Sequence, residues 1–130
     1  MSKTVALLGI DPFQIDFSNP DYLHFAHIGA EGIKSLLEKD KAKLISLGFD
    51  AEFMFTGIDA STARPDVEKV LESKSWDCIL IGNGVRSIPS NFLLFEMLIN
   101  MIVEFAPQAK VCFNTKPDDS VDAVLRWVSP

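Results

Sequence analysis

The stretch that decides the fold is Asp77-Cys78-Ile79-Leu80-Ile81-Gly82-Asn83-Gly84-Val85-Arg86, in which four apolar residues end abruptly at Gly-Asn-Gly. A short apolar run bounded by turn residues indicates a strand buried on both faces, followed by a loop that leads to a helix. Open α/β sheets bind their ligands beside such loops, at the carboxyl ends of the strands. The stretch therefore predicts a parallel sheet and the place of a binding site.

Strands and helices alternate along the rest of the chain. The apolar run of residues 5–10 ends at Asp11-Pro12 and predicts a central strand, whereas the period-two pattern of residues 49–56 predicts an edge strand. A last strand is predicted at residues 109–113. Helices are predicted at residues 33–47 with Gly48 as the stop, at 65–73 with Pro65 in the first turn, at 92–106 after a cap at Ser90 or Asn91, and at about 121–128.

This alternation predicts one domain, residues 1–130, with a three-layer α/β/α sandwich around a four-stranded parallel sheet of order 2-1-3-4. The architecture is a flavodoxin-like or Rossmann-like half, and its element order resembles a truncated flavodoxin-like or receiver-like domain. A receiver has its phosphoacceptor aspartate where this chain has Asn83, so phosphorylation is not expected. Winding reverses between the first and third strands, which predicts that Asp11 and Asn83 face each other there.

The loop of residues 82–90 is the main candidate ligand site. Its backbone amides, the following helix N-terminus and the Arg86 guanidinium all favour an anion, because arginine can clamp a carboxylate or phosphate with two hydrogen bonds. We therefore expect a small anionic metabolite, bound by Asp11, Asn83, Gly84, Arg86, Asn114 and Thr115. The structural alternative is that Gly82 and Gly84 supply turn conformations and that Arg86 pairs with Asp11, Asp16 or Glu96. Thr115 has its own alternative as a helix cap in Thr115-Lys116-Pro117-Asp118.

The sequence neither predicts nor excludes a reaction. It has no Gly-x-Ser-x-Gly elbow, and it lacks the Rossmann glycine fingerprint and the Walker lysine, so no cofactor is predicted. Asp11 is the candidate general acid or base, since burial at the switch point could raise its pKa. Its structural alternative is a carboxylate that accepts backbone amides within its own turn.

The segment between Asp11 and Ala30 is long for a strand-to-helix connection, and long loops are often functional, so we expect a lid over the site. The spacing Asp21-x-x-His24-x-x-His27 is compatible with a metal, but three-residue steps on a loop do not fix a geometry and no metal is predicted. The alternative is a short extra helix starting at Ser18-Asn19-Pro20-Asp21 and packed by Tyr22, Leu23 and Phe25.

Charge and composition indicate which classes of partner and which cellular compartment to expect. The net charge is −6 and the basic residues are scattered, which argues against nucleic acid and anionic membranes as partners. The first apolar run is too short for a signal segment, so a cytoplasmic location is expected. Cys78 and Cys112 both lie in apolar runs and are predicted to be core residues rather than a disulfide framework.

The predicted helix 92–106 has only Glu96, Asn100 and Glu104 as polar residues, and most of its circumference is apolar. A sheet covers one side of a helix, so we expect a homodimer through Leu94, Leu98, Met101, Ile102 and Phe105. The protein would then be a non-catalytic interaction module, the alternative to metabolite binding. The structural alternative is that the last helix covers this one, with Val124 and Trp127 as the lid.

Overall fold

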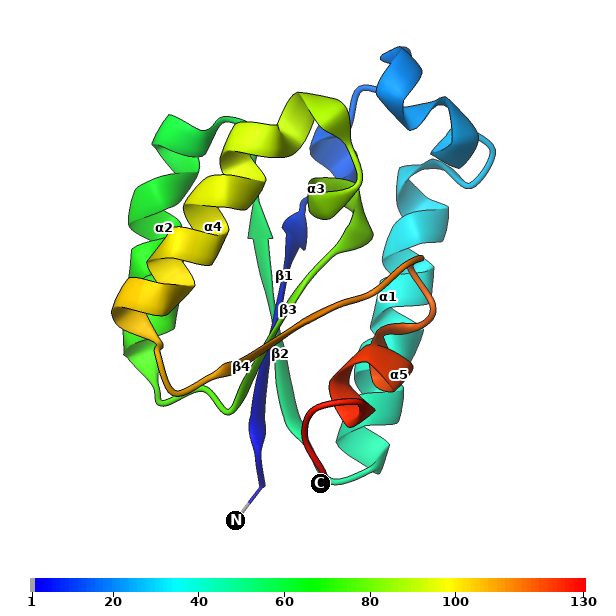
Figure 1. The fold of residues 1–130 in the computed structure, drawn as a ribbon. Helices are drawn as coiled ribbons and strands as arrows, with labels where there is room; N and C mark the ends of the chain where they lie inside the picture. Colours follow the sequence, from blue (N-terminus) through cyan, green and yellow to red (C-terminus); the bar gives the residue numbers. More distant parts are fainter. Residues whose placement is uncertain (1) are drawn as a thin grey trace.

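A computed structural model describes residues 2–130 and contains one four-stranded sheet, all parallel, in the order β2-β1-β3-β4 (Figure 1). The strands are β1 (Thr4–Ile10), β2 (Asp50–Thr56), β3 (Cys78–Ile81) and β4 (Lys110–Phe113). The predicted order 2-1-3-4 is confirmed. Winding reverses between β1 and β3, so their carboxyl ends form the switch point where such sheets bind ligands.

Helices cover both faces of the sheet (Figure 1). On one face α2 (Ala60–Ser73) packs against α4 (Phe92–Phe105), and on the other α1 (Gly29–Ser46) packs against α5 (Ser120–Leu125). Four shorter helical segments complete the fold: α3 (Asn83–Arg86) and the 3-10 helices η1 (Pro12–Gln14), η2 (Pro20–Phe25) and η3 (Pro89–Asn91). Across residues 2–130, no helix has the length and apolar character needed to cross a bilayer.

The core has two parts, one on each side of the sheet. The larger lies under α2 and α4 and includes Leu8, Ile79, Ile81 and Leu98. The smaller lies under α1 and α5 and includes both cysteines, which are fully buried free thiols with their sulfur atoms 3.6 Å apart. The prediction that the cysteines are core residues is confirmed.

The apolar side chains of α4 are mostly used within this chain. Four of the five predicted dimer residues are at most 2% exposed, packed between the sheet and α2, and Phe105 packs against the same core; the four are Leu94, Leu98, Met101 and Ile102. These side chains are unavailable to a partner while the chain keeps this fold. The alternative cover by the last helix is wrong, because α5 lies on the opposite face and Trp127 is 57% exposed.

Capping residues explain where the predicted boundaries shift. The Asp59 carboxylate accepts the N–H of Ser61 at 2.9 Å, so α2 begins at Ala60 and Pro65 lies inside the helix rather than in its first turn. The last helix begins at Ser120. Thr115 does not cap it, because its N–H and hydroxyl both donate to the Asp119 carboxylate. Gly48, which follows the C-cap residue Leu47 of α1, adopts φ +105°, as expected of a helix stop.

Candidate ligand-binding site

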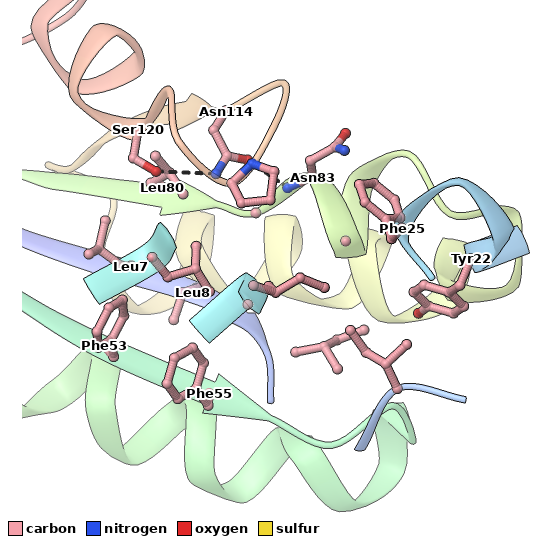
Figure 2. Close-up of a pocket in the computed structure, with 18 residues that line it drawn as sticks. Leu7, Leu8, Tyr22, Phe25, Phe53, Phe55, Leu80, Asn83, Asn114 and Ser120 are labelled. Carbon is pink, nitrogen blue, oxygen red and sulfur yellow. Dashed lines mark hydrogen bonds between the residues drawn. The ribbon is translucent and has the colours of Figure 1, made fainter. Parts of the chain in front are cut away.

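A cavity of about 80 Å³ lies at the carboxyl ends of β1 and β3 (Figure 2). Its walls are mainly apolar side chains from β1, β2 and α1, including Leu7, Leu8, Ile33, Leu37, Phe53 and Phe55. A single water needs roughly 10–15 Å³, whereas pockets for drug-sized ligands usually exceed about 300 Å³. The cavity therefore has room for a small molecule in the present conformation, and a larger one needs a wall to move.

Two glycines open this space. A Cβ atom added at Gly9, near the end of β1, or at Gly84, in α3, would meet no heavy atom within 4 Å. At Gly82 a Cβ would come within 3.4 Å of the Leu8 carbonyl oxygen, so this glycine allows close packing of β3 on β1. Neither Gly82 nor Gly84 has a positive φ. The turn after β3 therefore requires a left-handed backbone conformation at neither glycine.

A buried polar network runs along one end of the cavity (Figure 2). Asn114 is 2% exposed; its Oδ1 accepts the backbone N–H of Asn83 at 2.6 Å, and its Nδ2 donates to Ser120 Oγ at 3.2 Å. The backbone N–H of Ser120 donates in turn to Asp40 Oδ2 at 2.7 Å. Four residues from α1, α3, α5 and the end of β4 are thereby joined.

Asp40 was not predicted as a site residue. Its carboxylate is 1% exposed, and its Oδ1 has no hydrogen-bond partner among residues 2–130. The sequence contains a signal for its burial, because Asp40 lies at helical spacing from Ile33, Leu37 and Leu44 and so shares the apolar face of α1. Ser120 was missed because it sits in a run of polar residues that resembles an ordinary helix start.

Arg86 lies next to the cavity without lining it. Its exposed guanidinium donates to Asn83 Oδ1 at 3.2 Å and to the Asn114 carbonyl oxygen at 3.4 Å. It takes part in no ion pair within the described chain, so the alternative pairing with Asp11, Asp16 or Glu96 is wrong. The structure thus brings together three of the predicted ligand residues, Asn83, Arg86 and Asn114, in addition to Gly84 on the cavity wall.

The other two predicted ligand residues serve local structure. The half-buried Asp11 carboxylate accepts the N–H of Phe13 at 3.0 Å and caps η1, which matches its structural alternative. The Thr115 side chain is exposed and bonded to Asp119. Neither residue lines the cavity.

The long segment after β1 closes another side of the cavity. It contains η2, capped by Asn19, and from it Tyr22 and Phe25 project toward the space opposite Asn114 (Figure 2). The Tyr22 hydroxyl oxygen accepts a hydrogen bond from Asn91 Nδ2 at 2.5 Å, and the same nitrogen donates to the Gly84 carbonyl oxygen at 2.8 Å. Asn91 therefore does not cap α4 with its side chain. Burial raises the pKa of Tyr22.

A second contact fastens η2 to the start of α4. The Asp21 carboxylate accepts hydrogen bonds from the backbone N–H and the hydroxyl of Ser90. The Asp21 carboxylate is thus hydrogen-bonded to Ser90 and to neither His24 nor His27. Residues 2–130 hold no group of three or more His, Cys, Asp or Glu that could bind a metal. Leu23 is exposed rather than packed inward.

The site as a whole is an apolar cavity with a buried Asn114–Ser120 pair at one end, Tyr22 at another side and an arginine at its rim. No known protein family matches the chain, and no curated protein matches it in sequence.

Proposed function

We propose that this protein binds a small organic molecule in the cavity at the carboxyl ends of β1 and β3. The observation that carries the proposal is the open space left by Gly9 and Gly84 within apolar walls. A mainly apolar pocket with a few convergent polar groups at a switch point is the usual form of a small-molecule site in such sheets.

The proposed ligand is a small organic acid. An apolar body fits the walls formed by Leu7, Phe55 and Ile33, whereas a charged group would need an exposed cation at the rim. Arg86 is that cation, because its partners are a neutral amide and a backbone carbonyl, which a carboxylate would replace with a stronger, charge-assisted interaction. The anionic ligand expected from the sequence is thus retained, with most of its body apolar.

The test is a thermal-shift screen of small carboxylic acids and phosphates against wild type, Gly9→Val and Arg86→Ala. A ligand at 100 times its Kd should stabilise the folded protein by about 2.7 kcal/mol, which a melting curve detects. Gly9→Val should abolish the stabilisation by occupying the cavity, and the protein should still fold because a Cβ at this position meets no heavy atom within 4 Å. Arg86→Ala should weaken the binding of carboxylic acids and phosphates alike, because both would lose the guanidinium.

Two results would overturn the proposal. One is a screen in which no compound stabilises the wild type. The other is stabilisation that persists in a folded Gly9→Val protein, since the compound would then bind elsewhere.

A second proposal concerns the outer face of α4. Phe92, Leu93 and Val103 are 60%, 70% and 66% exposed, and this face is the part of α4 that a second copy of the chain could reach. We propose it as the contact of the homodimer expected from the sequence, in place of the buried residues. Sedimentation at rising concentration tests this: the mass should approach that of a dimer and return to that of a monomer in Leu93→Lys.

A further inference from the structure

We infer that the ligand is recognised through an acceptor oxygen, which receives hydrogen bonds from the Ser120 hydroxyl and the Asn114 side-chain amide. This inference rests on the proposed function, because it assigns the chemistry of one end of the same cavity. It concerns a pair of side chains that are each 2% exposed and both face the cavity (Figure 2).

The hydrogen bonds of Asn114 determine what it can still offer. A backbone N–H can only donate, so the bond from Asn83 requires the oxygen of the Asn114 amide at that position and its nitrogen on the Ser120 side. One hydrogen on Nδ2 goes to Ser120 Oγ, and the other remains. Asn114 therefore faces the ligand as a donor.

Ser120 also retains a hydrogen. Its oxygen accepts from Asn114, and its hydroxyl hydrogen has no acceptor in the part of the chain that the structure describes. The Tyr22 hydroxyl, on another side of the cavity, has the same hydrogen-bonding state as the Ser120 hydroxyl. The Tyr22 oxygen accepts from Asn91, whose orientation is fixed by the Gly84 carbonyl, and the Tyr22 hydroxyl hydrogen has no acceptor among residues 2–130. Buried donors that lack partners are costly, and a ligand oxygen would satisfy them.

Asp40 acts as a positioning residue in this arrangement. Its Oδ2 holds the first backbone N–H of α5 and thereby sets where the Ser120 hydroxyl lies. Burying a carboxylate with one oxygen unpartnered costs desolvation free energy, and fixing the start of α5 alone does not require a carboxylate. This cost supports a role of Asp40 beyond packing.

The experiment uses four probes that share one ring: cyclopentanone, cyclopentanecarboxylate, cyclopentylamine and methylcyclopentane. Their Kd values are measured by NMR titration against wild type, Ser120→Ala, Asp40→Asn and Asp40→Ala. We expect one or both oxygen probes to bind the wild type about tenfold more tightly than the amine, because one or two hydrogen bonds are at stake. A stronger acid supports the carboxylate ligand of the proposed function, whereas a stronger ketone would replace it with an uncharged carbonyl compound.

The variants separate recognition from stability. Ser120→Ala should reduce the preference for oxygen probes to about twofold or less. Asp40→Asn should keep it, because an amide oxygen can still accept the Ser120 N–H, whereas Asp40→Ala should lose it. A purely structural Asp40 would lower the melting temperature and leave the ratio of Kd values unchanged, and that result would overturn its positioning role.

Failure of the inference differs from failure of the proposed function. Methylcyclopentane and cyclopentylamine binding as tightly as both oxygen probes would overturn the inference and leave the cavity as a binding site. An oxygen preference that survives in folded Ser120→Ala would do the same. Binding of none of the four probes would overturn the proposed function, and the inference with it.

Discussion

The side-chain oxygen of Asn114 accepts the backbone N–H of Asn83 at 2.6 Å, which ties the end of β4 to the first residue of α3. An anion bound to this loop would compete for the same N–H. The loop amide that the sequence suggested for a ligand is thus already satisfied, and the open space lies beside it, between β1, α1 and η2.

Replacing Asn114 by alanine should destabilise the fold. The change leaves the half-buried N–H of Asn83 without its partner and removes the hydrogen bond to Ser120, and such losses cost about 1–3 kcal/mol. Urea unfolding measures the free energy. Asn100→Ala is the matched control, because Asn100 is exposed on α4 and its loss should cost no more than about 0.5 kcal/mol. Equal effects of the two variants would contradict the assignment.

Two leucines on opposite sides of α4 should respond very differently to truncation. Leu98 is fully buried under α2, so Leu98→Ala should lower the free energy of unfolding by about 2–5 kcal/mol. Leu93 is exposed, and Leu93→Ala should change the stability of the monomer by about 0.5 kcal/mol or less. Chemical unfolding at low protein concentration checks both. A large loss in Leu93→Ala there would mean that this face is buried in the monomer.

The hydrogen bonds of Asn91 should keep η2 docked against the rest of the fold. Asn91→Ala removes the donor to both Tyr22 and the Gly84 carbonyl, so amide hydrogens of residues 22–28 should exchange faster with solvent. The strands should keep their protection. Leu23→Ala is the control, because Leu23 lies on the same segment and is exposed. Unchanged exchange in Asn91→Ala would show that packing alone holds the segment.

Tyr22 gives a pH dependence of known sign. Burial raises its pKa in the folded state, so folding favours the protonated phenol. The resulting stabilisation is complete below the unfolded value of about 10 and is lost as pH rises through the folded value. Tyr22 is the only tyrosine, so phenolate absorbance reports its titration directly. The stability difference between wild type and Tyr22→Phe should shrink in alkaline solution, and a difference independent of pH would contradict this.

Much of the fold could be predicted because its signals are local. The apolar run before Gly82 and the run of residues 5–10 lie in central strands, and Asn114 could be placed at the same sheet edge as Asn83 from strand order alone. The register of parallel strands then brings their carboxyl ends together.

The remaining site residues depend on distant contacts that no local pattern contains. Asp40 and Ser120 are 80 residues apart, and Tyr22 and Asn91 are 69 apart. The partners of Arg86 could not be predicted either, since the sequence contains several acids and amides as candidates. The helix that covers the apolar side of α4 could not be predicted either, because it depends on which face of the sheet each helix takes. In the structure α2 lies on the same face as α4 and packs against it.

The hydrogen bond between Asp40 and Ser120 has a consequence for the order in which the cavity forms during folding. The cavity is complete only when α5, the last helix along the chain, has docked on α1, because Ser120 is its first residue. A chain that has folded without α5 docked lacks this wall of the cavity. Occupancy of the cavity would therefore report that α5 has docked on α1, and a bound ligand would hold α5 in place.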